Sequence, residues 1–253
     1  RAHPCSLRQS WAGVYCGSID GGGAGAGGFP IRKLTPRGVA DLSPSLSPCG
    51  KWVAVASYGE ESKGGWKGEV QDLQTDIYVF RSKDGGGRRE VVSGGAWPCW
   101  AAHGRALYFH RKSADGWWSI YKVELPHLYH YSEDEEEEEE VRGRTPRMTP
   151  PLAHEDHDYG RNPPVERVTP PLVHAFTPAA SLSGDWLAVA TRRPPSPFRH
   201  IEIFDLSTRA FVPVTAPLNP EKHHYNPFVT PRALGYHRCR DIHLLGPETV
   251  HQG

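Results

Sequence analysis

The segment His154-Glu-Asp-His-Asp158 places two imidazoles and three carboxylates within five residues. Both groups can bind hard or borderline metal ions. The candidate ligands are His154, Asp156, His157 and Asp158. A His-Glu-x-x-His metalloprotease motif would need a helix and a different spacing. A solvated polar loop beside the acidic run 133–140 explains the same residues, so we predict no metal centre and no cofactor.

The sequence lacks the residues that covalent catalysis needs. A serine hydrolase of the α/β type carries its nucleophile in Gly-x-Ser-x-Gly between a strand and a helix, with Asp and His later in the chain. This motif does not occur, and Gly17-Ser18 lacks the second glycine. The glycine-rich segment 21–28 has neither the Lys-Ser/Thr ending nor the following helix of a phosphate-binding loop. We therefore predict that these 253 residues are not an enzyme.

Charge and cysteine spacing argue against further classes of function. Lys+Arg 29 balances Asp+Glu 29, and basic pairs such as Arg88-Arg89 stand alone, so we predict no nucleic-acid partner. No window approaches the roughly 18 apolar residues of a membrane span. The five cysteines, at 5, 16, 49, 99 and 239, form no Cys-x-x-Cys pair. A cysteine zinc site is not expected, while free thiols packed among strands and a single disulfide both stay open.

The elements that would position any functional side chain are short strands. With 27 Gly, 24 Pro and 10% aromatic residues, the composition predicts many strands joined by turns. A polar turn followed by an apolar run occurs at 47–56 and again at 181–190, with looser copies at 101–110 and 230–237. Equivalent turns carry Gly50, Gly104 and Gly184. A repeat of about 40–55 residues with four short strands is typical of a β-propeller blade.

The repeat predicts an all-β chain that forms one propeller domain of four-stranded antiparallel blades. The expected units are 1–38 (the end of a preceding blade, with a Gly-rich loop), 39–95 (a blade), 96–171 (a blade with an acidic insertion at about 126–164), 172–217 (a blade) and 218–253 (the start of a further blade). These amount to about three whole blades and two part-blades of a ring that commonly has about four to eight. The segment 147–154 is nearly repeated at 167–174, and we favour the second copy as the delayed fourth strand.

The starts of the innermost strands predict a place for binding, because these strands line the central channel of a propeller. The possible channel-facing residues are His174, His223, His224, Tyr225 and Asn226. Their polar groups could contact a ligand or an ion. Packing and hydrogen bonding at the strand ends would explain them equally well.

Ser47-Pro-Cys-Gly-Lys-Trp-Val-Ala-Val-Ala56, followed by Asp76-Ile-Tyr-Val-Phe80, resembles the TolB-like β-propeller repeat. The usual form of that repeat is Ser-Pro-Asp-Gly-Lys, a strand of the Ile-Ala-Phe type, and then Asp-Ile-Tyr. Cys49 stands where Asp is usual, and Ala102-His103 and Leu182-Ser183 replace Pro-Asp in later copies. The likeness covers roughly 30–238, and the Trp-rich variants look most like plant TolB-related proteins. The resemblance implies a six-bladed parent ring.

Similar blades form the amino-terminal propeller of dipeptidyl peptidases and prolyl oligopeptidases, so the resemblance implies three functions. We favour a non-catalytic binding or scaffold module for a protein or peptide partner. One alternative is the gating propeller of a serine peptidase whose catalytic domain lies outside this chain. Another is an extracellular propeller that binds carbohydrate or ions. The chain opens at Arg1 without a leader, so we expect a fragment or mature segment, and the resemblance slightly favours secretion or the cell wall.

Overall fold

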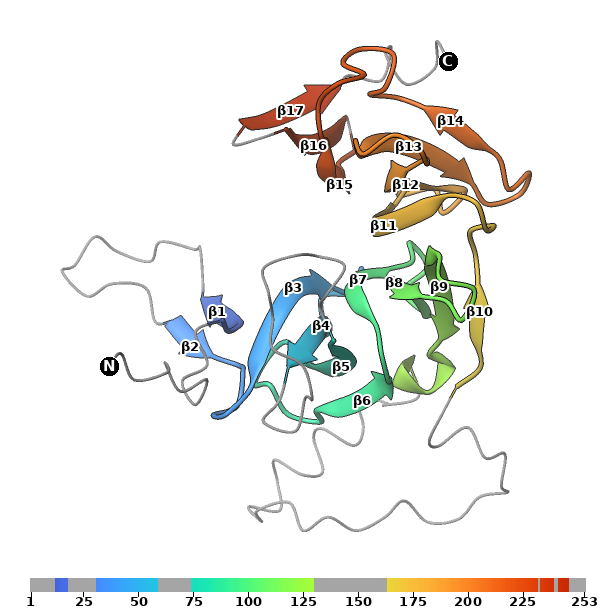
Figure 1. Cartoon of the computed structure of the whole chain (residues 1–253). Helices are drawn as coiled ribbons and strands as arrows, with labels where there is room; N and C mark the ends of the chain where they lie inside the picture. The colour runs from blue at the N-terminus through green and yellow to red at the C-terminus, as the bar shows by residue number, and fades with distance from the viewer. Residues whose placement is uncertain are drawn as a thin grey trace, which may run out of the picture.

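The described residues form antiparallel sheets that follow one another along an arc (Figure 1). The computed structural model describes residues 12–17, 31–58, 74–129, 163–231, 233–238 and 241–245. Within these ranges the only helix is the short 3-10 helix η2 (Pro126–Tyr129), and no helix is long and apolar enough to cross a membrane. The predicted partial β-propeller with four-stranded antiparallel blades is confirmed.

Three of the sheets have four strands, and in each sheet the strands lie in chain order. The first contains β3 (Ala40–Leu46), β4 (Trp52–Tyr58), β5 (Asp76–Arg81) and β6 (Arg89–Val92). The second contains β7 (Ala96–Trp100), β8 (Ala106–Lys112), β9 (Trp118–Glu124) and β10 (Val165–Arg167). The third contains β11 (His174–Ala180), β12 (Trp186–Arg192), β13 (His200–Asp205) and β14 (Phe211–Pro213).

Two smaller sheets flank these three. The first pairs β1 (Tyr15–Gly17) with β2 (Ile31–Lys33), and the last contains β15 (Tyr225–Val229), β16 (Leu234–Arg238) and β17 (Asp241–Leu245). The sequence pattern predicts strands at 11–19, 31–35, 223–229 and 233–237, near β1, β2, β15 and β16, and none near β17. The assignment of residues 1–253 to one propeller domain stays a prediction, and so do the expected blade boundaries.

The delayed fourth strand of the second sheet differs from its prediction. It ends at Arg167, and the next strand begins at His174, so the residues between them connect two sheets. Pro170 and Pro171 explain the difference, because proline has no N–H to donate to a strand ladder. The earlier copy, 147–154, lies outside the described residues.

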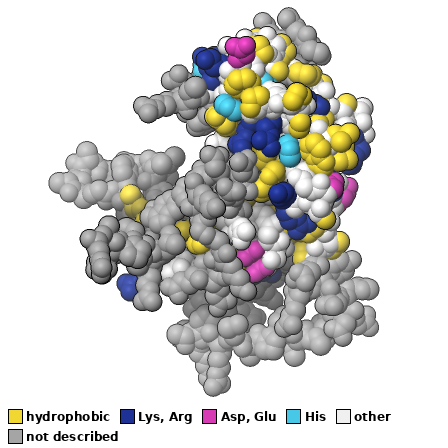
Figure 2. Space-filling view, viewed as in Figure 1, with side chains coloured by type: hydrophobic (Ala, Val, Ile, Leu, Met, Phe, Trp, Pro, Cys, Tyr) yellow, Lys and Arg dark blue, Asp and Glu magenta, His cyan; other side chains and the backbone are white. Residues whose placement is uncertain are grey.

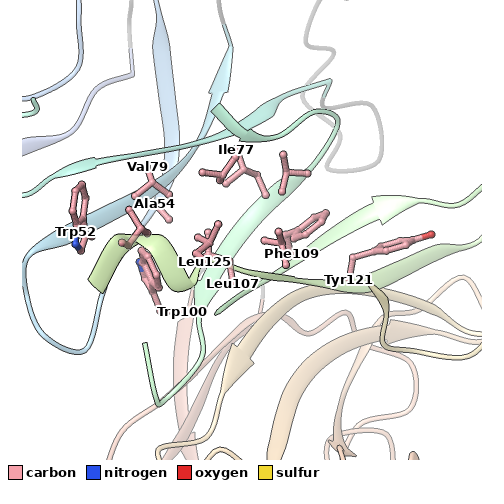
Figure 3. Packing of buried hydrophobic residues seen from close by; sticks show 13 residues of the cluster. Trp52, Ala54, Ile77, Val79, Trp100, Leu107, Phe109, Tyr121 and Leu125 are labelled. Carbon is pink, nitrogen blue, oxygen red and sulfur yellow. The ribbon is translucent and has the colours of Figure 1, made fainter. Parts of the chain in front are cut away.

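Apolar side chains fill the space between each sheet and the next. Figure 3 shows Ile77 and Val79 of β5 facing Leu107 and Phe109 of β8, and all four are fully buried. Three further clusters lie between the other successive sheets. Burial of one such side chain is worth about 1.5–3 kcal/mol. Packing of one sheet on the next therefore holds the blades together.

Each innermost strand bulges at a residue that precedes proline. The bulge residues, all with positive φ of 45–50°, are Ser43, Trp97, Thr177 and Asn226. The strand register shifts around each of them. Such φ values are uncommon outside glycine, and a bulge is where a strand accommodates proline. The strands β3, β7, β11 and β15, which contact one another in that order, thus bend at equivalent points.

In three sheets, a threonine that follows the last strand is hydrogen-bonded to the backbone of the strand before it. The side-chain oxygen Oγ1 accepts a hydrogen bond from the backbone N–H of Val14, Ile120 or Ile201, at 2.7, 2.9 and 2.8 Å. The three threonines are Thr35, Thr169 and Thr215. Because Thr35 occupies the same position relative to β1 and β2, this pair matches the last two strands of a blade. The interpretation of the whole segment 1–38 as the end of a preceding blade stays a prediction.

Thr215→Val tests this hydrogen bond. Thr215 is fully buried, so the valine variant leaves the Ile201 N–H without its acceptor. We expect the free energy of unfolding to fall by about 1–3 kcal/mol in urea denaturation. The control is Thr215→Ser, which keeps the hydroxyl and should lose no more than about 1 kcal/mol for its methyl group. Equal losses in the two variants would show that the hydroxyl contributes nothing.

Candidate binding surface at the channel mouth

The starts of the innermost strands lie beside the starts of the third strands, because alternate strands of an antiparallel sheet run the same way. His174 begins β11, Trp118 begins β9, and Tyr225 begins β15. The strand β11 contacts β7, β8, β9 and β15. This end of three successive sheets therefore brings together side chains that are far apart in the sequence.

Ring contacts connect these side chains without a break. From Trp97 the contacts run to His110 and from His110 to Trp118, with ring centroids 5.5 Å apart in both pairs. Trp118 contacts Phe176 at 5.7 Å, and the guanidinium carbon of Arg199 lies 4.6 Å from the centre of the Phe176 ring. These residues come from the second and third sheets.

The contacts continue to the last sheet. Arg199 also lies 5.9 Å from the ring centre of Tyr225, which stacks on His223 at 5.6 Å. His223 contacts Phe198 at 5.2 Å. His174 stacks on Phe176 at 6.2 Å, and the Trp117 and His174 rings are 4.6 Å apart.

We call this connected set the aromatic mouth. It comprises Trp97, His110, Trp117, Trp118, His174, Phe176, Phe198, Arg199, His223 and Tyr225. His110 and Phe176 are fully buried, and the others are half-buried. In the described part of the face in Figure 2, Lys, Arg and His side chains lie among hydrophobic side chains over the third sheet. The surface is thus aromatic and cationic.

The backbone fixes the proton position in three histidines of the mouth. The ring nitrogen Nδ1 of His110, His174 and His223 accepts a hydrogen bond from a backbone N–H, at 3.1, 3.3 and 3.2 Å respectively. A nitrogen that accepts carries no proton, so the neutral ring holds its proton on Nε2. The half-buried His174 and His223 therefore present Nε2–H as a donor, whereas Nε2 of the fully buried His110 has no hydrogen-bond partner among the described residues.

Burial and neighbouring cations keep these histidines neutral. Burial, and to a smaller extent the nearby charge of Arg199, lowers the pKa of His110 to about 3. Burial is also the first cause of the lowered pKa of His174 and His223, and Arg199 again contributes. At neutral pH the mouth therefore has neutral donors around a permanent guanidinium charge.

His224 lies between sheets rather than in the mouth. Its side chain is fully buried, 5.5 Å from the ring of His200 and 5.2 Å from that of Tyr236. Among the described residues neither of its ring nitrogens has a hydrogen-bond partner. Burial is the main cause that lowers its pKa to about 4, with smaller contributions from His200, Arg238 and His243.

Three of the five expected channel-facing residues belong to the aromatic mouth: His174, His223 and Tyr225. Asn226 is the bulge residue of β15 and is half-buried. Sequence reasoning missed Trp97, Trp117 and Arg199. Trp97 directly precedes the proline of an innermost strand, and this position could have been recognised in the sequence. Arg199 directly precedes the third strand of its sheet, which could have been recognised in the same way.

The remaining candidate groups can be placed only in part. The possible metal ligands at 154–158 lie outside the described residues. Within the described ranges, no cluster of three or more His, Cys, Asp or Glu side chains could hold a metal ion. Cys16, Cys49 and Cys99 are free thiols, and burial raises the pKa of Cys99. Cys5 and Cys239 fall outside the described residues.

Successive antiparallel sheets around contacting inner strands define a β-propeller, and among known structures this one is TolB-like. The chain resembles TolB from Acinetobacter baumannii, with a TM-score of 0.52 and 16% identity, over 89% of this chain and 46% of that one. It also resembles a puromycin-hydrolysing peptidase from Mycobacterium tuberculosis, with a TM-score of 0.53 and 18% identity, over 90% of this chain and 32% of that one.

These likenesses show the fold, and the chain spans less than half the length of either structure. No protein-family model and no curated protein sequence matches the chain. The likeness to plant proteins stays a prediction.

The buried histidine between the sheets predicts that stability depends on pH. An unfolded chain protonates His224 near the ordinary pKa of 6.5, whereas the folded chain resists protonation down to about 4. Between these values the unfolded state binds more protons, so the free energy of unfolding falls as the pH falls. One such group contributes at most about 1.4 kcal/mol per pH unit.

His224→Phe should reduce this slope by at most about 1.4 kcal/mol per pH unit in urea denaturation measured from neutral pH down to about 4, while His110, whose pKa is also lowered by burial, keeps its own contribution. His103→Gln is the control, because His103 is exposed and lies in the turn before β8. It should keep the dependence of the parent chain. Parallel curves for the parent and the phenylalanine variant would contradict the role of His224.

Proposed function

We propose that this chain is a non-catalytic β-propeller module that binds a protein or peptide partner through the aromatic mouth. The observation that carries the proposal is the connected set of aromatic, histidine and arginine side chains at one end of three sheets, of which all but His110 and Phe176 are half-buried. Trp, Tyr and Arg are enriched at protein interfaces and dominate their binding energy.

Two exposed leucines lie in connections that lead into the innermost strands. Leu172 is 73% exposed in the connection from β10 to β11, and Leu218 is 51% exposed in the connection from β14 to β15. Both connections lead into innermost strands whose starts form the mouth. Leu172 also has a φ of 76°, an unusual conformation for a side chain of this kind. Exposed apolar groups beside a polar site favour contact with another protein.

The mouth is held in shape before any partner arrives. Its rings pack against one another, and the backbone N–H groups of Trp118 and Arg199 lock the orientation of His174 and His223. A surface already fixed in this way loses little side-chain entropy on binding. This rigidity favours recognition of a short peptide segment.

A gating propeller of a serine peptidase is the second candidate. The fold likeness to the mycobacterial peptidase favours it. In that case the catalytic domain would lie outside these 253 residues, and the mouth would contact peptide on its way to that domain. The carbohydrate- or ion-binding alternative stays a prediction.

A peptide selection tests the mouth directly. Peptides selected from a phage-displayed library on the full chain should bind at least about tenfold more weakly to the double variant Trp117→Ala, Phe198→Ala. The matched control is Leu46→Ala, because Leu46 is 60% exposed at the end of β3, where the opposite ends of the sheets lie. Urea denaturation shows that both variants are folded. Equal affinity for the double variant and the control would overturn the proposal.

A further inference from the structure

Serine or threonine directly precedes proline at several places in the described residues. Proline-directed protein kinases select such pairs, because a following proline has no backbone N–H that the kinase would have to satisfy. Most of these hydroxyl-bearing residues cannot be reached while the chain is folded. The buried ones are Thr35, Ser47, Thr169 and Thr177.

Ser43 and Thr230 also precede proline, and the fold holds both of them. Ser43 is the bulge residue of β3, inside a strand that is paired with β4. The side-chain oxygen Oγ1 of Thr230 accepts a hydrogen bond from the N–H of Ala233 at 2.9 Å and donates to its carbonyl at 3.0 Å. In the described part of the chain this leaves Ser196, which precedes Pro197.

Ser196 lies in the connection from β12 to β13, outside any strand. Ser196 itself is half-buried, whereas Pro194, Pro195 and Pro197 on either side of it are exposed. Its backbone N–H donates to the carbonyl of Arg193 at 2.9 Å, a bond within the connection. A kinase can therefore bind this segment without breaking a sheet.

The hydroxyl group of Ser196 is free to react. Its oxygen Oγ accepts a hydrogen bond from the N–H of Phe198 at 3.2 Å. Among the described residues, the hydroxyl proton has no acceptor. A kinase can therefore remove this proton without first breaking a hydrogen bond that the hydroxyl donates.

We propose that Ser196 is a phosphorylation site for a proline-directed serine/threonine kinase, which transfers the γ-phosphoryl group of ATP. A bond forms between Ser196 Oγ and phosphorus, the bond from phosphorus to the oxygen shared with the β-phosphate breaks, and ADP leaves. The hydroxyl proton passes to the catalytic aspartate of the kinase. The phosphoserine carries a charge of about −1.5 to −2 at pH 7.

The phosphate would lie at the edge of the aromatic mouth. Phe198, whose N–H binds Ser196 Oγ, contacts His223 with the ring centroids 5.2 Å apart. A charged group beside apolar rings loses part of its hydration when a partner covers it, which opposes binding. Phosphorylation therefore weakens partner binding at the mouth, and this consequence rests on the proposed function.

Mapping of phosphate on the full folded chain tests the site. The probe is a mitogen-activated protein kinase with MgATP, and mass spectrometry quantifies phosphate at each residue. Ser196 should be modified. Ser47, which precedes proline but is buried, and Ser207, which is exposed but precedes threonine, should both stay unmodified. Thr145 and Thr149 precede proline outside the described residues, and the map reads them separately.

Variants separate the recognition of proline from the effect on the mouth. Pro197→Ala should abolish phosphate at Ser196, whereas Pro217→Ala, a control at an exposed proline before β15, should keep it. Peptides selected on the unmodified chain should bind the phosphorylated chain at least about fivefold more weakly. Ser196→Ala treated with the same kinase should keep the affinity of the unmodified chain.

The outcomes separate this inference from the proposed function. An unmodified Ser196 in the folded chain, whether or not a synthetic peptide of residues 190–202 is phosphorylated, overturns the site. Phosphate that persists at Ser196 in Pro197→Ala overturns the proline-directed class of kinase. Phosphate at Ser196 with unchanged peptide affinity leaves the site and overturns its effect on the mouth. Selected peptides that do not depend on Trp117 and Phe198 overturn the binding module, and the phosphate map still decides the site.

Discussion

Apolar packing between successive sheets is the interaction on which the rest of this structure depends. The strands β4, β8 and β12 are buried along most of their length, because each lies inside a sheet covered on both faces. Strands covered on both faces read as continuous apolar runs rather than as alternating ones. Such a sheet leaves little room for polar side chains within its faces, so the chemistry gathers where the strands begin and end.

The bulges of the innermost strands help to form the candidate binding surface at the strand ends. In β11 the register shifts between Phe176 and Ala179, where Thr177 adopts its positive φ. The N–H of Thr177 donates to Nδ1 of His110 on β8 instead. That single bond satisfies a buried backbone donor, fixes the tautomer of a buried histidine and places its ring between Trp97 and Trp118. Backbone geometry thus organises the floor of the mouth.

Local sequence patterns predicted the strands and the glycine turns, because both depend on neighbouring residues. Gly50, Gly104 and Gly184 all adopt the left-handed conformation that their place in the repeat implies. The same reasoning found His174 and Tyr225, which start innermost strands. It could not find the contact of Arg199 with Phe176, because residues distant in sequence meet only when sheets pack. Nor could it tell that His224 is buried while its neighbour His223 stays half-exposed.

Acid affects the histidines of the aromatic mouth and the buried His224 differently. The charge of Arg199 acts together with burial to hold the pKa of His110, His174 and His223 below the ordinary value. The donors of the mouth therefore keep their tautomers and their neutrality throughout the neutral range. His224 is also neutral there, but its protonation would place a charge between two sheets. The charge state of the aromatic mouth is thus insulated from small changes in pH around neutrality, whereas the packing that supports it weakens in acid.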